Sequence, residues 1–291
     1  MNKELIFALL FGFSLHGLAQ VRFNSNAPDL FQQYGSPESL IGKKSSDLKV
    51  KNLGKLALFG PLQRKDIKAL QKQIQLELLL LRNNSLTTLP EEPFASNNLI
   101  AFSSQMNPLK ALPGNLLTSA SIMYLELTET ELDSFPTRSN LPNLHLLRII
   151  KNNTDSLVFP DSMPGFPQLQ SVEFFNVPLT CFPNFLTRCP NLEQIIMNGC
   201  RLDSIPSSIS NLKKLHTLDV ENNALKHLPH ALASLPALRR LNVAGNKLHT
   251  FPEYLMYAPQ LEELGVKNNP MHAEDIEILR IIGRATQTVV D

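Results

Sequence analysis

Two glutamates in this 291-residue chain are the residues best placed by type and spacing for acid–base chemistry. Glu126 and Glu173 occupy equivalent positions of a repeated segment, with Arg148 at the equivalent position between them. In one row on successive strands the two carboxylates would be roughly 9.6 Å apart, close to the separation in inverting glycosidases. The arginine argues against a hydrolase, because an adjacent cation lowers a carboxyl pKa and a general acid needs a raised one. We expect a cross-strand ion ladder that can orient a polar ligand group.

Three histidines provide the other chemical candidate, since His227 and His230 flank a Leu-Pro pair and His249 lies one repeat further on. Imidazoles bind transition metals. No cysteine or clear carboxylate completes the set, so we expect solvated surface histidines and neither a metal nor a cofactor. The sequence has no phosphate-binding glycine loop, no H-E-x-x-H and no G-x-S-x-G. These observations favour a protein that is not an enzyme.

The chain has three cysteines, an odd number that does not indicate a disulfide framework. Cys189 and Cys200 fall at repeat positions that point inward, and we interpret them as small core side chains. Cys181 is expected to face outward, and its sequence context does not decide whether its thiol is reactive.

A period of 23 residues organises most of the chain and positions all of these side chains. The phrase L-x-x-L-x-L-x-x-N-x-L-x-x-L-P is clearest between Leu192 and Met271. Carried backward, it gives spacings of 23, 23, 23, 22, 25, 23, 23, 23 and 23 residues. The repeats start at Leu53, Leu76, Leu99, Ile122, Leu144, Leu169, Leu192, Leu215, Leu238 and Leu261.

The alternation within L-x-x-L-x-L is the period of a strand with one face buried. A single coil cannot bury its leucines alone, so the coils must stack. Asparagine at the ninth position turns the chain out of the strand, and its buried amide is expected to bond main-chain groups of its own and the next coil. The asparagines that fit are Asn84, Asn107, Asn152, Asn223, Asn246 and Asn269, whereas Thr130, Val177 and Cys200 should interrupt the ladder. Proline after the last apolar residue excludes a long helix there.

These residues resemble the leucine-rich repeat family, in its short bacterial and plant-like L-P-x-x-L form, from about Leu53 to the C-terminus. The resemblance implies an α/β solenoid, a right-handed horseshoe of about ten coils. It also implies a parallel sheet on the concave side and irregular or 3₁₀ backbone on the convex side. Some bacterial relatives carry a ubiquitin-ligase domain after the repeats; here about 20 residues follow the last one.

The two ends of the chain have their own signals. Residues 1–19 resemble a secretory signal peptide, with an apolar run from Leu5 to Leu15 and a small-x-small site at residues 17–19. A membrane anchor or a buried N-terminal helix is the alternative interpretation. A polar leader spans 20–47, the repeat array 48–271, and a C-terminal capping helix and tail 272–291. Short helices are expected to cap the solenoid at 66–73 and 273–284, and a frayed tail is expected after the second helix, at 285–291. In the second helix Ile278, Leu279, Ile281 and Ile282 are expected to cover the last coil.

Composition limits the class of partner. Hydrophobic residues make up 43% of the chain, formal net charge is +1, and no Lys/Arg-rich run stands out, so nucleic acid is not an expected partner. No stretch of the mature chain is apolar for long enough to span a membrane. With a signal peptide, we expect a secreted, periplasmic or cell-surface protein.

The strand positions that point away from the core form three rows along the concave face. Apolar side chains gather there where water is expected, which usually marks an interaction site. Strand propensity alone is the alternative explanation. We expect partner binding by Tyr124, Leu146, Arg148, Ile150, Glu173, Phe175 and Ile196. A second apolar group, Phe59, Leu78 and Leu80, could instead be covered by the leader. The predicted function is protein or peptide binding; the alternative is a self-associating structural or adhesion protein.

Overall fold

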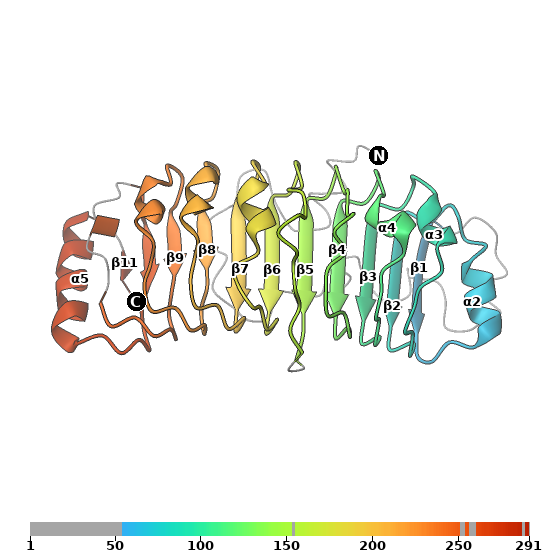
Figure 1. Cartoon of the computed structure of the whole chain (residues 1–291), viewed down its shortest axis with the longest axis horizontal. Helices are drawn as coiled ribbons and strands as arrows, with labels where there is room; N and C mark the ends of the chain where they lie inside the picture. Colours follow the sequence, from blue (N-terminus) through green and yellow to red (C-terminus); the bar gives the residue numbers. More distant parts are fainter. Residues whose placement is uncertain (1–53, 153–154, 251–253, 256–259, 287–288, 291) are drawn as a thin grey trace.

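The computed structural model describes residues 54–152, 155–250, 254–255, 260–286 and 289–290. The predicted signal peptide and leader therefore lie outside the described residues. Within them, the strands form one open parallel sheet in strict chain order, β1 to β11 (Figure 1). The strands are β1 (Lys55–Phe59), β2 (Leu78–Arg82), β3 (Ala101–Gln105), β4 (Tyr124–Thr128), β5 (Leu146–Ile150), β6 (Ser171–Phe175), β7 (Gln194–Asn198), β8 (Thr217–Asp219), β9 (Arg240–Asn242), β10 (Glu263–Gly265) and β11 (Val289–Val290). Each of the ten predicted coils contributes one strand, β1 to β10.

Equivalent residues of successive repeats pair with each other along the sheet. Ala101 pairs with Tyr124, and Gln194 pairs with Thr217, each one repeat further along the chain. This register follows from the period, because a strand shifted by one residue would turn its leucines to the wrong face. Residues at the same position in the repeat therefore stand in straight rows across the sheet.

The convex side carries short helical segments, as predicted, but not all of them are 3₁₀. The N-terminal coils have short α-helices, α3 (Glu92–Ala95) and α4 (Gly114–Leu117). The later coils have the 3₁₀ segments η4 (Asn184–Arg188), η5 (Ser207–Asn211) and η6 (His230–Ser234), each directly after a Phe-Pro, Ile-Pro or Leu-Pro pair. Proline fixes an extended entry and lacks an N–H, so the segment starts after it and stays short.

The main hydrophobic core lies between the sheet and these segments. Inward leucines such as Leu147, Leu192 and Leu215 are completely buried, and a stack of phenylalanines extends the core where Phe159 lies against Phe135 and Phe174. Each fully buried side chain of this size contributes roughly 1.5–3 kcal/mol. Stacking of coils is thus the main source of stability for the sheet.

Helices cap both ends of the solenoid, but two details predicted for the C-terminal end are wrong. Helix α2 (Arg64–Leu70) closes the front and α5 (Ala273–Thr286) the back (Figure 1). Leu279 is buried, but the prediction that Ile278 and Ile281 cover the last coil is wrong, because they are 43% and 56% exposed. Ile276 packs on the core in their place. The predicted frayed tail is also corrected, since Val289–Val290 pairs with β10 as strand β11.

The asparagine ladder is present and interrupted as predicted, apart from one position. Asn223 Nδ2 donates to the carbonyls of Met197 and Val220, and its Oδ1 accepts from Cys200 N–H. Thr130, Val177 and Cys200 are buried in the slots that lack asparagine. Asn152, predicted to join the ladder, is exposed instead and bonds to Glu129 and Asn176, while Lys151 is buried beside it.

Candidate functional site

The candidate site lies on the sheet face turned away from the main core, over β4 to β7. This is the concave face of the expected horseshoe. All seven predicted site residues are on it because they occupy the outward positions of four adjacent strands. The register pairs Tyr124 with Leu146, Arg148 with Glu173, and Ile150 with Phe175. The structure therefore brings the predicted residues together in three neighbouring rows.

The first row is not exposed, which corrects the expectation for two site residues. Tyr124 is 1% exposed and Leu146 is 6% exposed. They belong to a second apolar cluster, separate from the main core, that also contains Ala57, Leu78, Leu80 and Ala101. Apolar side chains at the same position of four consecutive strands, Leu78, Ala101, Tyr124 and Leu146, form one cluster with Ala57 and Leu80 of the next row. This end of the face is therefore a packed layer and presents little apolar surface.

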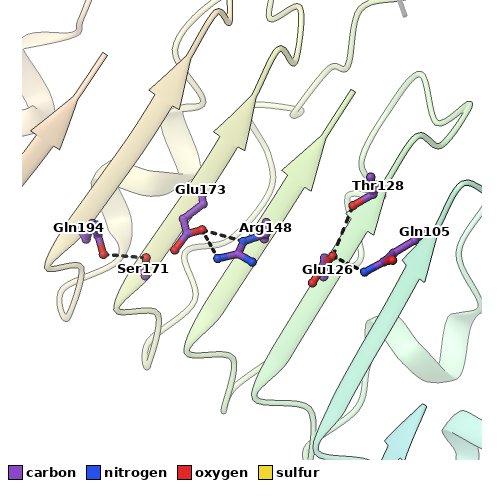
Figure 2. Close-up of polar contacts among 7 residues, drawn as sticks. All are labelled: Gln105, Glu126, Thr128, Arg148, Ser171, Glu173 and Gln194. Atoms are coloured by element: carbon purple, nitrogen blue, oxygen red, sulfur yellow. Dashed lines mark hydrogen bonds and ion pairs between the residues drawn. The ribbon is translucent and has the colours of Figure 1, made fainter. Parts of the chain in front are cut away.

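An ion pair lies in the second row. Arg148 Nε and Nη2 lie 2.7 and 2.5 Å from Glu173 Oε2, and both side chains are buried (Figure 2). This part of the predicted ladder is confirmed. Glu126, the third predicted member, accepts hydrogen bonds from Gln105 Nε2 at 2.9 Å and from Thr128 Oγ1 at 3.5 Å. The guanidinium and the two carboxylates are thus held in fixed positions at the floor of the face.

Three apolar side chains beside this ion pair remain half-exposed. Ile150 and Phe175 pair across β5 and β6, and Ile196 pairs with Glu173 from β7. We call Ile150, Phe175 and Ile196 the apolar patch. It is the part of the predicted site at which a partner can reach apolar surface.

Asn198, Asp219 and Glu221 also stand in the concave rows, and they were not among the predicted site residues. Asp219 is next to Ile196 in register and is only 3% exposed. Burial raises its pKa to about 6, although hydrogen bonds from the Glu221 backbone, Asn198 and Asn242 oppose the shift. The sign available in the sequence was the order of residues along the rows. Asp219 follows Ile196 in one row, and Asn198 and Glu221 follow Phe175 in the next. We call Asn198, Asp219 and Glu221 the acceptor cluster.

The histidines and cysteines show no shared site. The His230 ring stacks on Tyr254 with centroids 4.2 Å apart. Among the described residues, no group of three His, Cys, Asp or Glu side chains could hold a metal ion. Cys189 and Cys200 are buried as predicted, and burial raises their pKa to about 11 and about 12, while Cys181 is exposed. High thiol pKa values make the two core cysteines poor nucleophiles.

Over the described part of the chain, no helix has the length and apolar character needed to cross a bilayer.

Known families and structures share the repeat and the architecture. Residues 190–248 match the family model described as Leucine rich repeat. A search of curated proteins gives no match. Among solved structures, TLR13 in complex with ssRNA13 is similar with a TM-score of 0.66 and 24% identity, over 76% of this chain and 33% of that one. This chain thus spans about a third of the length of TLR13.

Two further structures have the same arrangement. The plant peptide hormone receptor RGFR1, solved in complex with RGF2, has a TM-score of 0.53 and 22% identity, over 76% of this chain and 40% of the receptor. An internalin, inlF of Listeria monocytogenes, has a TM-score of 0.61 and 21% identity, over 84% of this chain and 68% of the internalin. At these identities the likeness concerns the fold.

Proposed function

This chain folds as a leucine-rich-repeat solenoid, and from that premise we propose that it is a non-enzymatic module that binds a protein or peptide on its concave face, outside the cytoplasm. One observation carries the proposal. The apolar patch, Ile150, Phe175 and Ile196, is half-exposed and occupies neighbouring positions on three adjacent strands. Contiguous apolar surface on a soluble protein usually marks an interaction site, and an aromatic residue at its centre is a typical anchor.

The surroundings of the patch suit binding better than catalysis. The buried Arg148–Glu173 pair beside it bonds within itself, so it orients the floor of the face. A catalytic site would need an acid and a base converging on a pocket, whereas the one carboxylate among the seven predicted residues, Glu173, is paired with Arg148. The signal-peptide pattern in residues 1–19 supports action outside the cytoplasm.

The comparisons support a polypeptide partner without selecting it. RGFR1 was solved with a peptide hormone and TLR13 with single-stranded RNA. Tight RNA binding needs several cationic contacts to phosphates. The patch and the acceptor cluster carry none, and the formal net charge of the chain is +1. A protein or peptide is therefore the proposed ligand class.

The test is the double substitution Ile150→Glu with Phe175→Glu. A partner is first identified by cross-linking to the native chain in its native source. The two added carboxylates should reduce capture of that partner at least tenfold, because apolar contact is replaced by charge that must be desolvated. The matched control is Ala244→Glu with Lys267→Glu, in the same row but on the β9 and β10 repeats. Circular-dichroism melting of all three proteins checks folding. Equal capture by the patch variant and the native chain would remove the patch as the site.

Self-association is the second candidate, because one observation favours it. Ile278 and Ile281 are exposed on α5 at the end of the solenoid. Apolar side chains at a solenoid end can join two copies. Sedimentation equilibrium of the native chain and of Ile281→Arg separates the two functions. A native monomer at high concentration would exclude this candidate.

A further inference from the structure

We propose that the partner carries a lysine or arginine next to a large apolar side chain, and that its basic group binds at the acceptor cluster while the apolar group contacts the apolar patch. The inference rests on the proposed function, because it names the partner chemistry for the same face. It commits the site to a basic, amphipathic peptide segment.

The patch and the cluster are immediate neighbours on three strands. Ile196 of β7 pairs with Asp219 of β8, and Phe175 of β6 pairs with Asn198 of β7. Neighbouring strands lie about 4.8 Å apart. A bound segment that places an apolar side chain on Phe175 and Ile196 therefore has its adjacent side chains within reach of Asn198 and Glu221.

The carboxylates of the cluster differ from Glu173 and Glu263 of the same face in having no ion-pair partner among the described residues. Glu173 is paired with Arg148, and Glu263 is paired with Arg240 at 3.1 Å. Within the described ranges, neither Asp219 nor Glu221 has a salt bridge. The next positions in their rows hold Asn242 and Ala244, and the nearest cation in the row of Glu221 is Lys267, two positions away. The carboxylates of Asp219, at the end of β8, and of Glu221, just after it, thus form no ion pair within the described residues.

Neutral donors hold the two carboxylates in place. The Glu221 N–H donates to Asp219 Oδ1 at 3.2 Å, and Asn242 Nδ2 donates to Glu221 Oε2 at 3.3 Å. Asp219 is too buried for direct contact with a partner, so it acts through its charge. Glu221 is half-exposed and is the carboxylate that a partner can touch.

A third acceptor gives an independent sign of a missing donor. Asn198 Oδ1 is buried, and no described group donates a hydrogen bond to it. A buried acceptor without a donor costs about 1–3 kcal/mol. A lysine ammonium has three donors and an arginine guanidinium five, with no acceptor on either. One such group can donate to the half-exposed Glu221 carboxylate and offset the charge of Asp219.

The repeat itself does not require this arrangement. The position of Asp219 is occupied by Ser103, Glu126, Arg148 and Glu173 in four other coils. The acidic pair beside the apolar patch is therefore a property of this place on the solenoid and not of the leucine-rich framework.

Panning of a phage-displayed random peptide library on the immobilised full-length protein tests the inference. Enriched peptides should place a lysine or arginine within a few residues of a large apolar residue. Against one such peptide, Glu221→Gln should weaken affinity by about tenfold and Asp219→Asn by less. Glu263→Gln, which removes a carboxylate already paired with Arg240, should leave affinity unchanged.

The outcomes separate this inference from the function on which it rests. Peptides that are enriched, lose binding with Phe175→Glu, and show no basic preference would overturn the inference and leave the proposed function standing. Equal affinity for the native chain and Glu221→Gln would do the same. If only acidic peptides are enriched, and only with added calcium, the oxygen atoms of the acceptor cluster bind a metal ion and the inference is overturned. If no enriched peptide needs Phe175 for binding, the result would count against both the inference and the proposed function.

Discussion

The Nζ atom of Lys151 donates a hydrogen bond to the carbonyl oxygen of Leu132 at 2.8 Å, and the lysine side chain is 0% exposed. Desolvation lowers the pKa of Lys151, although Asp155, Asp133 and Glu129 raise it in part. A buried ammonium of this kind is a cost of the fifth coil that the other coils do not carry.

Replacement of Lys151 by methionine should therefore leave stability at pH 7 unchanged or improved, because the apolar chain fills the same space without a charge. Lys151→Ala is the matched control and should lose about 2–4 kcal/mol through the cavity it leaves. Urea unfolding at pH 7 measures both. An equal loss in the two variants would show that the hydrogen bond to Leu132, and not the packing, holds this coil.

A comparison of the native chain with Lys151→Met also tests how the stability depends on pH. A lysine whose pKa is lower folded than unfolded is penalised while charged in the native state. That penalty is full at neutral pH and is relieved as pH rises through the folded pKa toward 10.5, the ordinary pKa of lysine. The native chain should therefore gain stability relative to Lys151→Met as pH rises above neutral, toward that value. A constant difference across this range would contradict the lowered pKa.

The fifth coil also shows where the period stops being informative. In the other described coils a residue with positive φ follows the strand, at Gly60, Asn83, Met106, Glu129, Asn176, Gly199, Asn222, Gly245 and Asn268. Lys151 has the same place in the repeat and lacks positive φ. The chain leaves the strand differently there, so the next residue, Asn152, is turned to solvent. The 25-residue spacing indicated an irregular coil, but it could not indicate which side chain would be buried.

The strand rows were predictable because leucine spacing fixes which residues point inward, and the pairing of β1 to β10 follows the repeat starts read from the sequence, including the spacings of 22 and 25 residues. Exposure along the rows was not. Whether Tyr124 is open depends on what stands beside it on β3 and β5, and the apolar first row packs together. The Arg148–Glu173 contact was predictable from opposite charges at one repeat position. The desolvation of Asp219 depends on its neighbours in three dimensions and left no periodic signal.

Asn223 should matter more to stability than Cys200, which fills the equivalent slot one coil earlier. Asn223 Oδ1 accepts from the N–H groups of Cys200 and Leu202, both at 3.0 Å. Asn223→Ala leaves these buried donors and the Met197 carbonyl without that partner, so we expect a loss of about 2–4 kcal/mol.

Cys200→Ala is the comparison, because Cys200 Sγ makes only long contacts, 3.5 and 3.6 Å, with carbonyl oxygens. We expect a loss of about 1 kcal/mol from the small volume removed. Urea midpoints at constant slope give both values. Equal losses would mean that the asparagine ladder adds little beyond filling space.

Asp219 should make the native chain less stable at neutral pH than Asp219→Asn. Its pKa rises from 3.8 to about 6 on folding, mainly through burial. The difference corresponds to about 3 kcal/mol favouring the protonated form in the native state. Above pH 6 the buried carboxylate is charged and the penalty is full; as pH falls from 6 toward 3.8 the native state takes up a proton first and the penalty disappears.

Asparagine has nearly the same shape and no charge, and its oxygen can still accept from the Glu221 N–H. We therefore expect Asp219→Asn to be more stable by about 1–3 kcal/mol at pH 7. The difference should shrink toward zero near pH 4. Urea unfolding of both proteins between these pH values measures it, and subtraction removes the titration of shared groups. Glu221→Gln, a half-exposed carboxylate on the same repeat, controls for the loss of one negative charge. A pH-independent difference between Asp219→Asn and the native chain would show that Asp219 titrates alike in the folded and unfolded states.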